Sequence, residues 1–96
     1  MANVPITKRA PNAPFGSDAS PGVAKLVGFR LSASGGGEAV VELNCGPQHY
    51  NPMGTVHGGV LCDIADAAMG VAFASTLDVD QSFTTLELKI NFLRPV

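Results

Sequence analysis

The residues best placed to do chemistry lie where a predicted helix begins, between Thr55 and Asp66. The first turn of a helix leaves backbone N–H groups without internal partners, and their dipoles favour negative charge nearby. Gly58 and Gly59 would let a ligand approach these groups closely. Such a site could stabilise the charge that develops on a carbonyl oxygen under attack. The same residues also fit a helix that His57 or Thr55 merely caps, with glycines that only permit close packing.

Asp66 favours the catalytic interpretation. No lysine or arginine occurs between Arg30 and Lys89, so no cation close in sequence can pair with this carboxylate. A carboxylate on an otherwise apolar helix either points to solvent or is retained for function. Asp66 is therefore the leading candidate for a catalytic group, although the solvent-facing alternative stays open.

Two other kinds of chemistry are weaker alternatives. Asp63 and Asp66 could hold a metal together with His57 or His49, but the spacing does not bring His57 onto their face, so no metal is expected. A Cys62 thiolate activated by His57 is conceivable, yet these residues diverge on a helix. The sequence contains no Gly-x-Ser-x-Gly motif and no phosphate-binding glycine pattern, so neither a serine nucleophile nor a cofactor is expected.

The elements that must position these residues follow from hydrophobic periodicity. Residues 1–21 hold four of the seven prolines and predict a flexible N-terminal arm. Residues 23–33 alternate in a way that predicts a strand, and glycines within 34–37 predict a tight hairpin turn. Residues 38–44 predict the second, antiparallel strand.

The second half of the chain predicts a loop, one long helix and a third strand. Residues 46–54 are dense in turn-forming residues, which indicates an irregular loop. The helix should run from His57 to about Ser75 with hardly any polar face, so other structure must wrap it. Residues 83–93 alternate most clearly and predict a strand.

This order predicts one α+β domain over residues 22–96, with a curved antiparallel sheet around a central helix. Three strands would leave one flank of the helix bare. We therefore expect further strands beyond residue 96 or a second chain that completes the sheet, and the domain looks incomplete at its C-terminus.

Composition excludes several classes of protein. With 46% apolar and 15% charged residues, the chain is globular rather than disordered. A net charge of −2 gives no broad positive field, so neither nucleic acid nor an anionic membrane surface is expected as a partner. Cys45 and Cys62 are too few for a disulfide framework. A cytoplasmic location fits best, because the N-terminus also lacks the apolar core of a secretion signal.

One stretch has the length of a membrane span. Residues 56–77 are long enough, but His57, Asp63 and Asp66 would each be costly in hydrocarbon. The stretch is therefore expected to be a buried helix of a soluble protein.

Three short motifs, in this order and spacing, resemble the phenylacetate-pathway (PaaI-like) type of hot-dog thioesterases. The resemblance covers about residues 23–96. The motifs are Asn51-x-x-Gly54-x-x-His57-Gly58-Gly59, then Asp66 within Ile-Ala-Asp-Ala-Ala, then Thr84-Thr85-Leu-x-Leu-x-Ile-Asn91-Phe-Leu-Arg94-Pro95.

The resemblance implies a hot-dog fold that hydrolyses acyl- or aryl-acyl-CoA thioesters, paired into homodimers or homotetramers with active sites at the dimer interface. It implies that Asp66 acts as general base or nucleophile and that the Gly58 N–H polarises the thioester carbonyl. Relatives of this type continue past the Arg-Pro pair with further strands.

Further residue roles come from the same resemblance. Asn51 would hold substrate or water, His57 would lie beside the thioester, and Thr85 would orient water from across the interface to Asp66. Gly59 and Arg94 are expected to bind substrate. A non-catalytic acyl-CoA-binding module and a hot-dog dehydratase remain alternatives.

Overall fold

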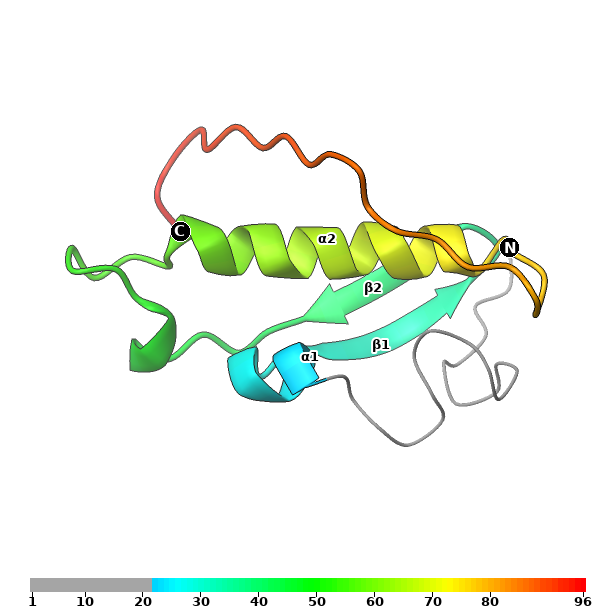
Figure 1. Ribbon diagram of the computed structural model, residues 1–96. Coiled ribbons are helices and arrows are strands. Elements are labelled where there is room, and N and C mark those ends of the chain that lie inside the picture. The colour runs from blue at the N-terminus through cyan, green and yellow to red at the C-terminus, as the bar shows by residue number, and fades with distance from the viewer. Residues whose placement is uncertain (1–21) are drawn as a thin grey trace.

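The computed structural model describes residues 22–96 as one long helix packed on a two-stranded hairpin (Figure 1). The predicted arm over residues 1–21 lies outside the described residues. In chain order the elements are α1 (Gly22–Val27), β1 (Arg30–Gly35), β2 (Glu38–Glu42), the short 3₁₀ helix η2 (Pro47–His49) and α2 (Gly58–Ala74).

The hairpin forms where the glycines predict it. β1 and β2 pair antiparallel from Arg30 opposite Glu42 to Gly35 opposite Glu38, with one irregularity after Leu31. The turn between the strands needs left-handed backbone, with φ of 60° at Gly36, and residues with a side chain rarely adopt this conformation. The predicted hairpin is therefore confirmed.

The first predicted strand begins too early, because residues 22–27 form α1 instead. Gly28 ends this helix with a φ of 95°, and its N–H donates to the carbonyl of Ala24 over 2.7 Å. Ala24 and Phe29 are buried on either side of that stop. The alternating pattern across this stretch is thus produced by one helical turn followed by a strand.

The long helix begins and ends within a residue of its predicted limits. His57 caps α2, because its Nδ1 accepts the N–H of Gly59 over 3.0 Å. At the other end the Ser75 hydroxyl donates to the carbonyl of Ala72 over 2.6 Å and accepts the N–H of Gly37 over 2.8 Å. The C-terminal end of α2 is therefore tied to the hairpin turn.

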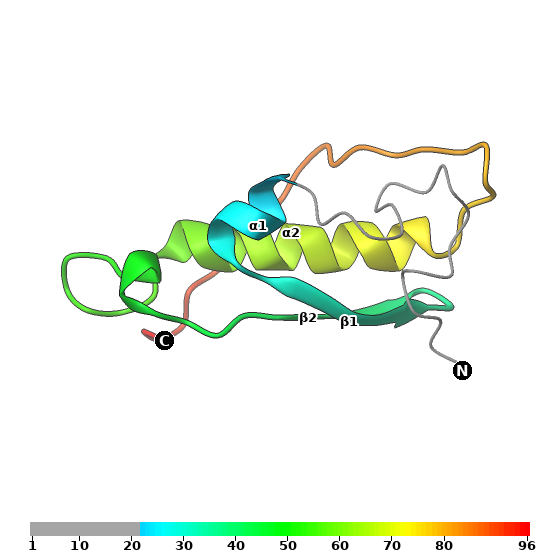
Figure 2. The ribbon, with the colours of Figure 1, turned by 90° about the horizontal axis from the view of Figure 1, so that it is seen from below.

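The third predicted strand is wrong for the described residues. Residues 83–93, called here the 83–93 segment, form no strand. The segment runs along α2 on the side away from the hairpin (Figures 1 and 2). A strand needs a neighbour to share its backbone hydrogen bonds, and no such neighbour is present in residues 22–96. An alternating pattern predicts a strand, but it does not say which other strand would pair with it.

Two aromatic rings hold the 83–93 segment against α2. A Cβ atom on Gly58 would lie 2.9 Å from the ring of Phe92, and one on Gly70 would lie 3.1 Å from the ring of Phe83. Phe83 also meets Phe73 edge-on, with ring centroids 5.8 Å apart. The glycines at both ends of α2 thus make room for the rings.

The structure is α+β with a central helix and a two-stranded antiparallel sheet, so the predicted wrapping sheet is present only in part. No helix within residues 22–96 is long and apolar enough to cross a membrane. The small core includes Ala24, Phe29, Val56, Val71 and Ala74.

We expect Val71→Ala to lower the free energy of unfolding by about 2 kcal/mol, because two methyl groups of a side chain that is 1% exposed leave a cavity. Urea denaturation followed by circular dichroism measures this. Val23→Ala is the matched control, since Val23 also lies on a helix but is 50% exposed, and it should change the stability by less than about 0.5 kcal/mol. Equal losses in both variants would contradict the assignment of the core.

Candidate active site

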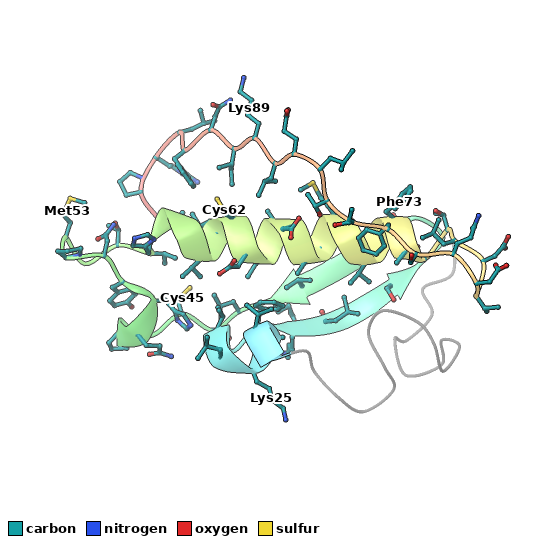
Figure 3. All side chains as sticks on the ribbon, in the orientation of Figure 1. Lys25, Cys45, Met53, Cys62, Phe73 and Lys89 are labelled. Atoms are coloured by element: carbon teal, nitrogen blue, oxygen red, sulfur yellow. The ribbon has the colours of Figure 1, made fainter. Side chains whose placement is uncertain are left out.

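The hydrogen-bond partner of the Asp66 carboxylate is a hydroxyl group. The hydroxyl of Thr85 donates to Oδ1 of Asp66 over 2.8 Å, and the carboxylate is half-buried on α2. Within residues 22–96 one ion pair is present, between Arg30 and Glu42. Lys89 points away from α2 (Figure 3). Asp66 is therefore a carboxylate held on an apolar helix by a single neutral group.

Thr85 belongs to the same chain as the carboxylate that it contacts. The family resemblance placed it across a subunit interface from Asp66, whereas the structure shows a hydrogen bond between the two side chains within one chain. The contact is possible because the 83–93 segment lies along α2, between the ring contacts at Gly70 and Gly58. In this position the Thr85 side chain lies close enough to α2 to donate a hydrogen bond to Asp66.

The first turn of α2 leaves one backbone donor free. Gly59 donates to the ring of His57, while Val60 and Leu61 both donate to the His57 carbonyl, over 3.0 and 3.4 Å. The remaining N–H of this turn, that of Gly58, meets no acceptor among the described residues. This is the group expected to polarise a carbonyl oxygen, whereas the Gly59 N–H is already occupied.

A hollow of about 420 Å³ lies beside that free donor. Its lining includes Asn51, Gly58, Leu61, Phe92 and Arg94. The hollow therefore brings together three of the residues that the sequence singled out for binding, with apolar walls between them. Asp66 does not line it.

Asn51 closes the loop that leads into α2. Its Oδ1 accepts the N–H groups of Met53 and Thr55 over 3.0 and 3.1 Å, and its Nδ2 donates to the Thr55 hydroxyl over 2.8 Å. A short bridge between Tyr50 and Val56 encloses these contacts. The side chain thus shapes the loop, and one amide hydrogen remains for a ligand.

The two histidines play different parts. His57 is exposed and uses its ring as the helix cap. His49 is buried, and its ring bonds to Gly46 and to the carbonyl of Val27. The sequence indicated His49 only as a weak metal candidate, and no spacing rule pointed to its contact with Val27, which lies 22 residues earlier.

The weaker alternatives find no geometric support in residues 22–96. No three side chains of the His, Cys, Asp and Glu types come together in this part of the chain as a metal site would require. Cys62 is half-buried and shares no hydrogen bond with His57, whose Nδ1 caps the helix.

Gly58 and Asp66 do not converge within one chain. They are eight residues apart on α2, which at about 1.5 Å per residue places them about 12 Å apart along the axis. A reacting carbonyl needs both its oxyanion donor and its attacking group within about 3 Å. Within one chain the Gly58 N–H and the Asp66 carboxylate are therefore too far apart to act on the same carbonyl group.

Residues 53–96 match the family described as the Thioesterase superfamily. The matched part holds Gly58, Asp66 and Thr85. A 1,4-dihydroxy-2-naphthoyl-CoA hydrolase from Listeria monocytogenes is 29% identical over 72 residues, which are 75% of this chain and 58% of the hydrolase. Protein PA0474 of Pseudomonas aeruginosa, provisionally named an esterase, is 36% identical over 55 residues, or 57% of this chain and 41% of that protein.

One solved structure has a similar fold. The conserved protein PA5202 of Pseudomonas aeruginosa superimposes with a TM-score of 0.76 at 36% identity, over 80% of this chain and 62% of that one. The chain spans between about two fifths and three fifths of the length of these relatives. The chain is thus similar to thioester hydrolases and esterases in sequence, and to PA5202 in fold.

We expect Asn51→Ala to open the loop locally, because three hydrogen bonds that close it are lost. Hydrogen exchange at the Thr55 amide should become at least about fivefold faster, corresponding to about 1 kcal/mol. Asn51→Asp keeps an oxygen that can accept the N–H groups of Met53 and Thr55, so it should change the exchange rate of the Thr55 amide far less than Asn51→Ala does. Equal exchange rates at Thr55 in the alanine variant and the native chain would contradict the role of this side chain.

Proposed function

We propose that this chain carries the active-site residues of a hot-dog thioesterase of the PaaI-like type, which hydrolyses acyl- or aryl-acyl-CoA to a free acid and coenzyme A. The observation that carries the proposal is the half-buried Asp66 carboxylate, held by the Thr85 hydroxyl and without an ion pair to any cation of residues 22–96. An uncompensated carboxylate costs stability on an apolar helix, which favours a functional reason for it. The match of residues 53–96 to the Thioesterase superfamily supports the same reaction.

Asp66 would act through the oxygen that Thr85 leaves free. Oδ1 accepts the threonine hydroxyl, so Oδ2 is available to take a proton from water or to attack the thioester carbonyl directly. Attack forms a tetrahedral oxyanion, and its collapse breaks the carbon–sulfur bond and releases the thiolate of coenzyme A. Where water attacks, the collapse gives the free acid directly, and the proton that Asp66 took can pass to the thiolate. Where Asp66 attacks, the collapse leaves an acyl-aspartyl anhydride, which a water molecule then hydrolyses to the free acid and the restored carboxylate. Thr85 keeps the carboxylate in one orientation and offers its own oxygen to the water.

The oxyanion would be stabilised at the start of α2. The free N–H of Gly58 points from the positive end of the helix dipole, where developing negative charge is favoured. Asn51, which lines the same hollow, would hold the thioester or the water with its remaining amide hydrogen. His57, which directly precedes Gly58, would lie beside the thioester. Arg94, which lines the hollow, would contact phosphates of coenzyme A. Gly59, whose N–H already donates to His57, would only leave room for the substrate beside the helix start.

The active site would be shared between two chains. The separation of about 12 Å along α2 keeps Gly58 and Asp66 of one chain from serving one thioester. A homodimer with twofold symmetry lets Gly58 of each chain meet Asp66 of its partner, forming two equal sites. A homotetramer would contain two such pairs. The large apolar side chains Met69 and Phe73 are more than half exposed on α2, which supports an association of this kind.

The proposal extends to aromatic acyl groups. The Listeria monocytogenes relative is named as a hydrolase of 1,4-dihydroxy-2-naphthoyl-CoA, an aromatic thioester. In this chain the ring of Phe92 and the side chain of Leu61 line the hollow beside Gly58. Aryl-acyl thioesters are therefore the first substrates to test, with a medium-chain acyl-CoA for comparison.

We expect Asp66→Asn to lower the rate of thiol release from phenylacetyl-CoA by about 10²–10⁴-fold, because the amide can neither accept the proton nor attack. Asp63→Asn is the matched control, since Asp63 is an exposed carboxylate one turn away on the same helix. Its rate should stay within about twofold of the native chain. The released thiol is followed with a chromogenic disulfide.

Three results would contradict the proposal. An unchanged rate in Asp66→Asn would exclude Asp66 as the base or nucleophile. Saturable binding of phenylacetyl-CoA without thiol release from the native chain would indicate a binding module. Hydration of crotonyl-CoA without any thioester hydrolysis would indicate a dehydratase.

A second prediction tests the shared site by complementation. Gly58→Pro removes the proposed donor, and the ψ of 134° at His57 suits the residue before a proline. The proline carbons would collide with the Phe92 ring, so Gly58→Pro is made together with Phe92→Ala. A homodimer of the Asp66→Asn chain should be inactive, and so should a homodimer of the double variant. A mixed dimer of the two, purified through two different tags, should regain about half of the native activity, because one of its two symmetric sites is intact.

The Phe92→Ala single variant is the reference for the double variant, since it keeps the Gly58 donor. No recovery in the mixed dimer, while Phe92→Ala alone stays active, would contradict a shared site. It would indicate that each chain supplies both groups to its own site.

A further inference from the structure

His49 is a buried titratable side chain that the proposed reaction does not use. It is 3% exposed, although it lies in the loop before α2. Its Nδ1 accepts the N–H of Gly46 over 3.0 Å, and Nε2 bonds to the carbonyl of Val27. Both ring nitrogens therefore have partners, and one of these lies 22 residues earlier in the chain.

These partners determine the state of the ring. A backbone N–H can only donate and a carbonyl oxygen can only accept, so Nδ1 must carry no hydrogen while Nε2 carries one. The ring is thus neutral, accepts one hydrogen bond at Nδ1 and donates one hydrogen bond from Nε2. A ring bonded this way acts as a rigid link between the end of α1 and the turn that holds η2.

The backbone of His49 extends this link to the start of α2. Its carbonyl accepts the N–H of His57 over 2.8 Å, and the next residues are joined by the bridge between Tyr50 and Val56. His57 precedes Gly58, and the peptide between these two residues carries the Gly58 N–H. The orientation of that N–H therefore depends on where the His49 carbonyl holds His57.

We propose that His49 is a positioning residue that directs the Gly58 N–H toward the thioester oxygen, by joining the end of α1 to the N-terminus of α2. The inference rests on the proposed function, in which Gly58 stabilises the oxyanion. The chain of contacts that carries it runs from the Val27 carbonyl through the His49 ring and carbonyl to His57. Such a link pre-organises the donor before the substrate arrives.

Three variants separate the two ring contacts. His49→Asn places an oxygen near the position of Nδ1 and keeps the acceptor for Gly46. His49→Gln reaches the position of Nε2 and keeps the donor for Val27, while His49→Leu keeps neither. Ser75→Ala is the matched control, because it removes a comparable hydrogen bond between separate elements at the opposite end of α2.

We expect His49→Leu to lower kcat by about 10²-fold with KM within about twofold, because a misdirected donor weakens transition-state binding and not ground-state binding. His49→Asn and His49→Gln should each recover part of this loss. In the ¹⁵N–¹H NMR spectrum the Gly58 amide signal should shift in all three variants. Ser75→Ala should change stability alone, with kcat and the Gly58 signal unchanged.

The NMR measurement keeps this inference distinct from the proposed function. A native chain without thioesterase activity would refute the function, whereas a shift of the Gly58 signal in the His49 variants would still support the positioning link. An unmoved Gly58 signal in the folded Asn and Gln variants would overturn the inference. So would a kcat for these variants equal to that of Ser75→Ala.

Discussion

The need to cover α2 is the constraint on which the rest of the structure depends. The helix is apolar nearly all round, and such a helix is stable in water only when other structure packs against it. The hairpin covers one side and the 83–93 segment another (Figure 1). Even so, only Val71 and Ala74 among its 17 residues are fully buried by residues 22–96. The remaining apolar surface favours association with further structure, which agrees with a site shared between chains.

The same packing builds one half of the site. The 83–93 segment has no neighbouring strand within residues 22–96, so its position depends on what its side chains contact. The rings of Phe83 and Phe92 occupy the space left by Gly70 and Gly58, and Thr85 meets Asp66 between them. A larger residue at either glycine would push the segment outward and carry Thr85 away from the carboxylate. Packing at the two ends of the segment therefore controls a polar contact near its middle.

The sequence predicted well the features that depend on neighbouring residues. Positive-φ glycines placed the hairpin turn, and the apolar run with His57 before it placed α2 to within one residue. The lack of Lys and Arg between Arg30 and Lys89 also predicted that Asp66 has no cation close in sequence, and its partner in the structure is the Thr85 hydroxyl. Two strand predictions failed, one at the start of the first strand and one over residues 83–93. Both have the same cause, because an alternating pattern does not say whether a second strand is available for pairing. Residues 22–27 form a helical turn, and the 83–93 segment has no strand to pair with among residues 22–96.

The loop before α2 shows why the rest of the site could not be predicted. Its composition indicates turns, but not which polar group bonds to which, and the ring of His49 finds its partner 22 residues away. Buried polar groups must be satisfied, so the side chains of Asn51 and His49 are almost fully used within the protein. The N–H of Gly58, by contrast, has no acceptor within residues 22–96. A donor left free at the N-terminus of a helix is what a pre-organised site for a developing negative charge requires.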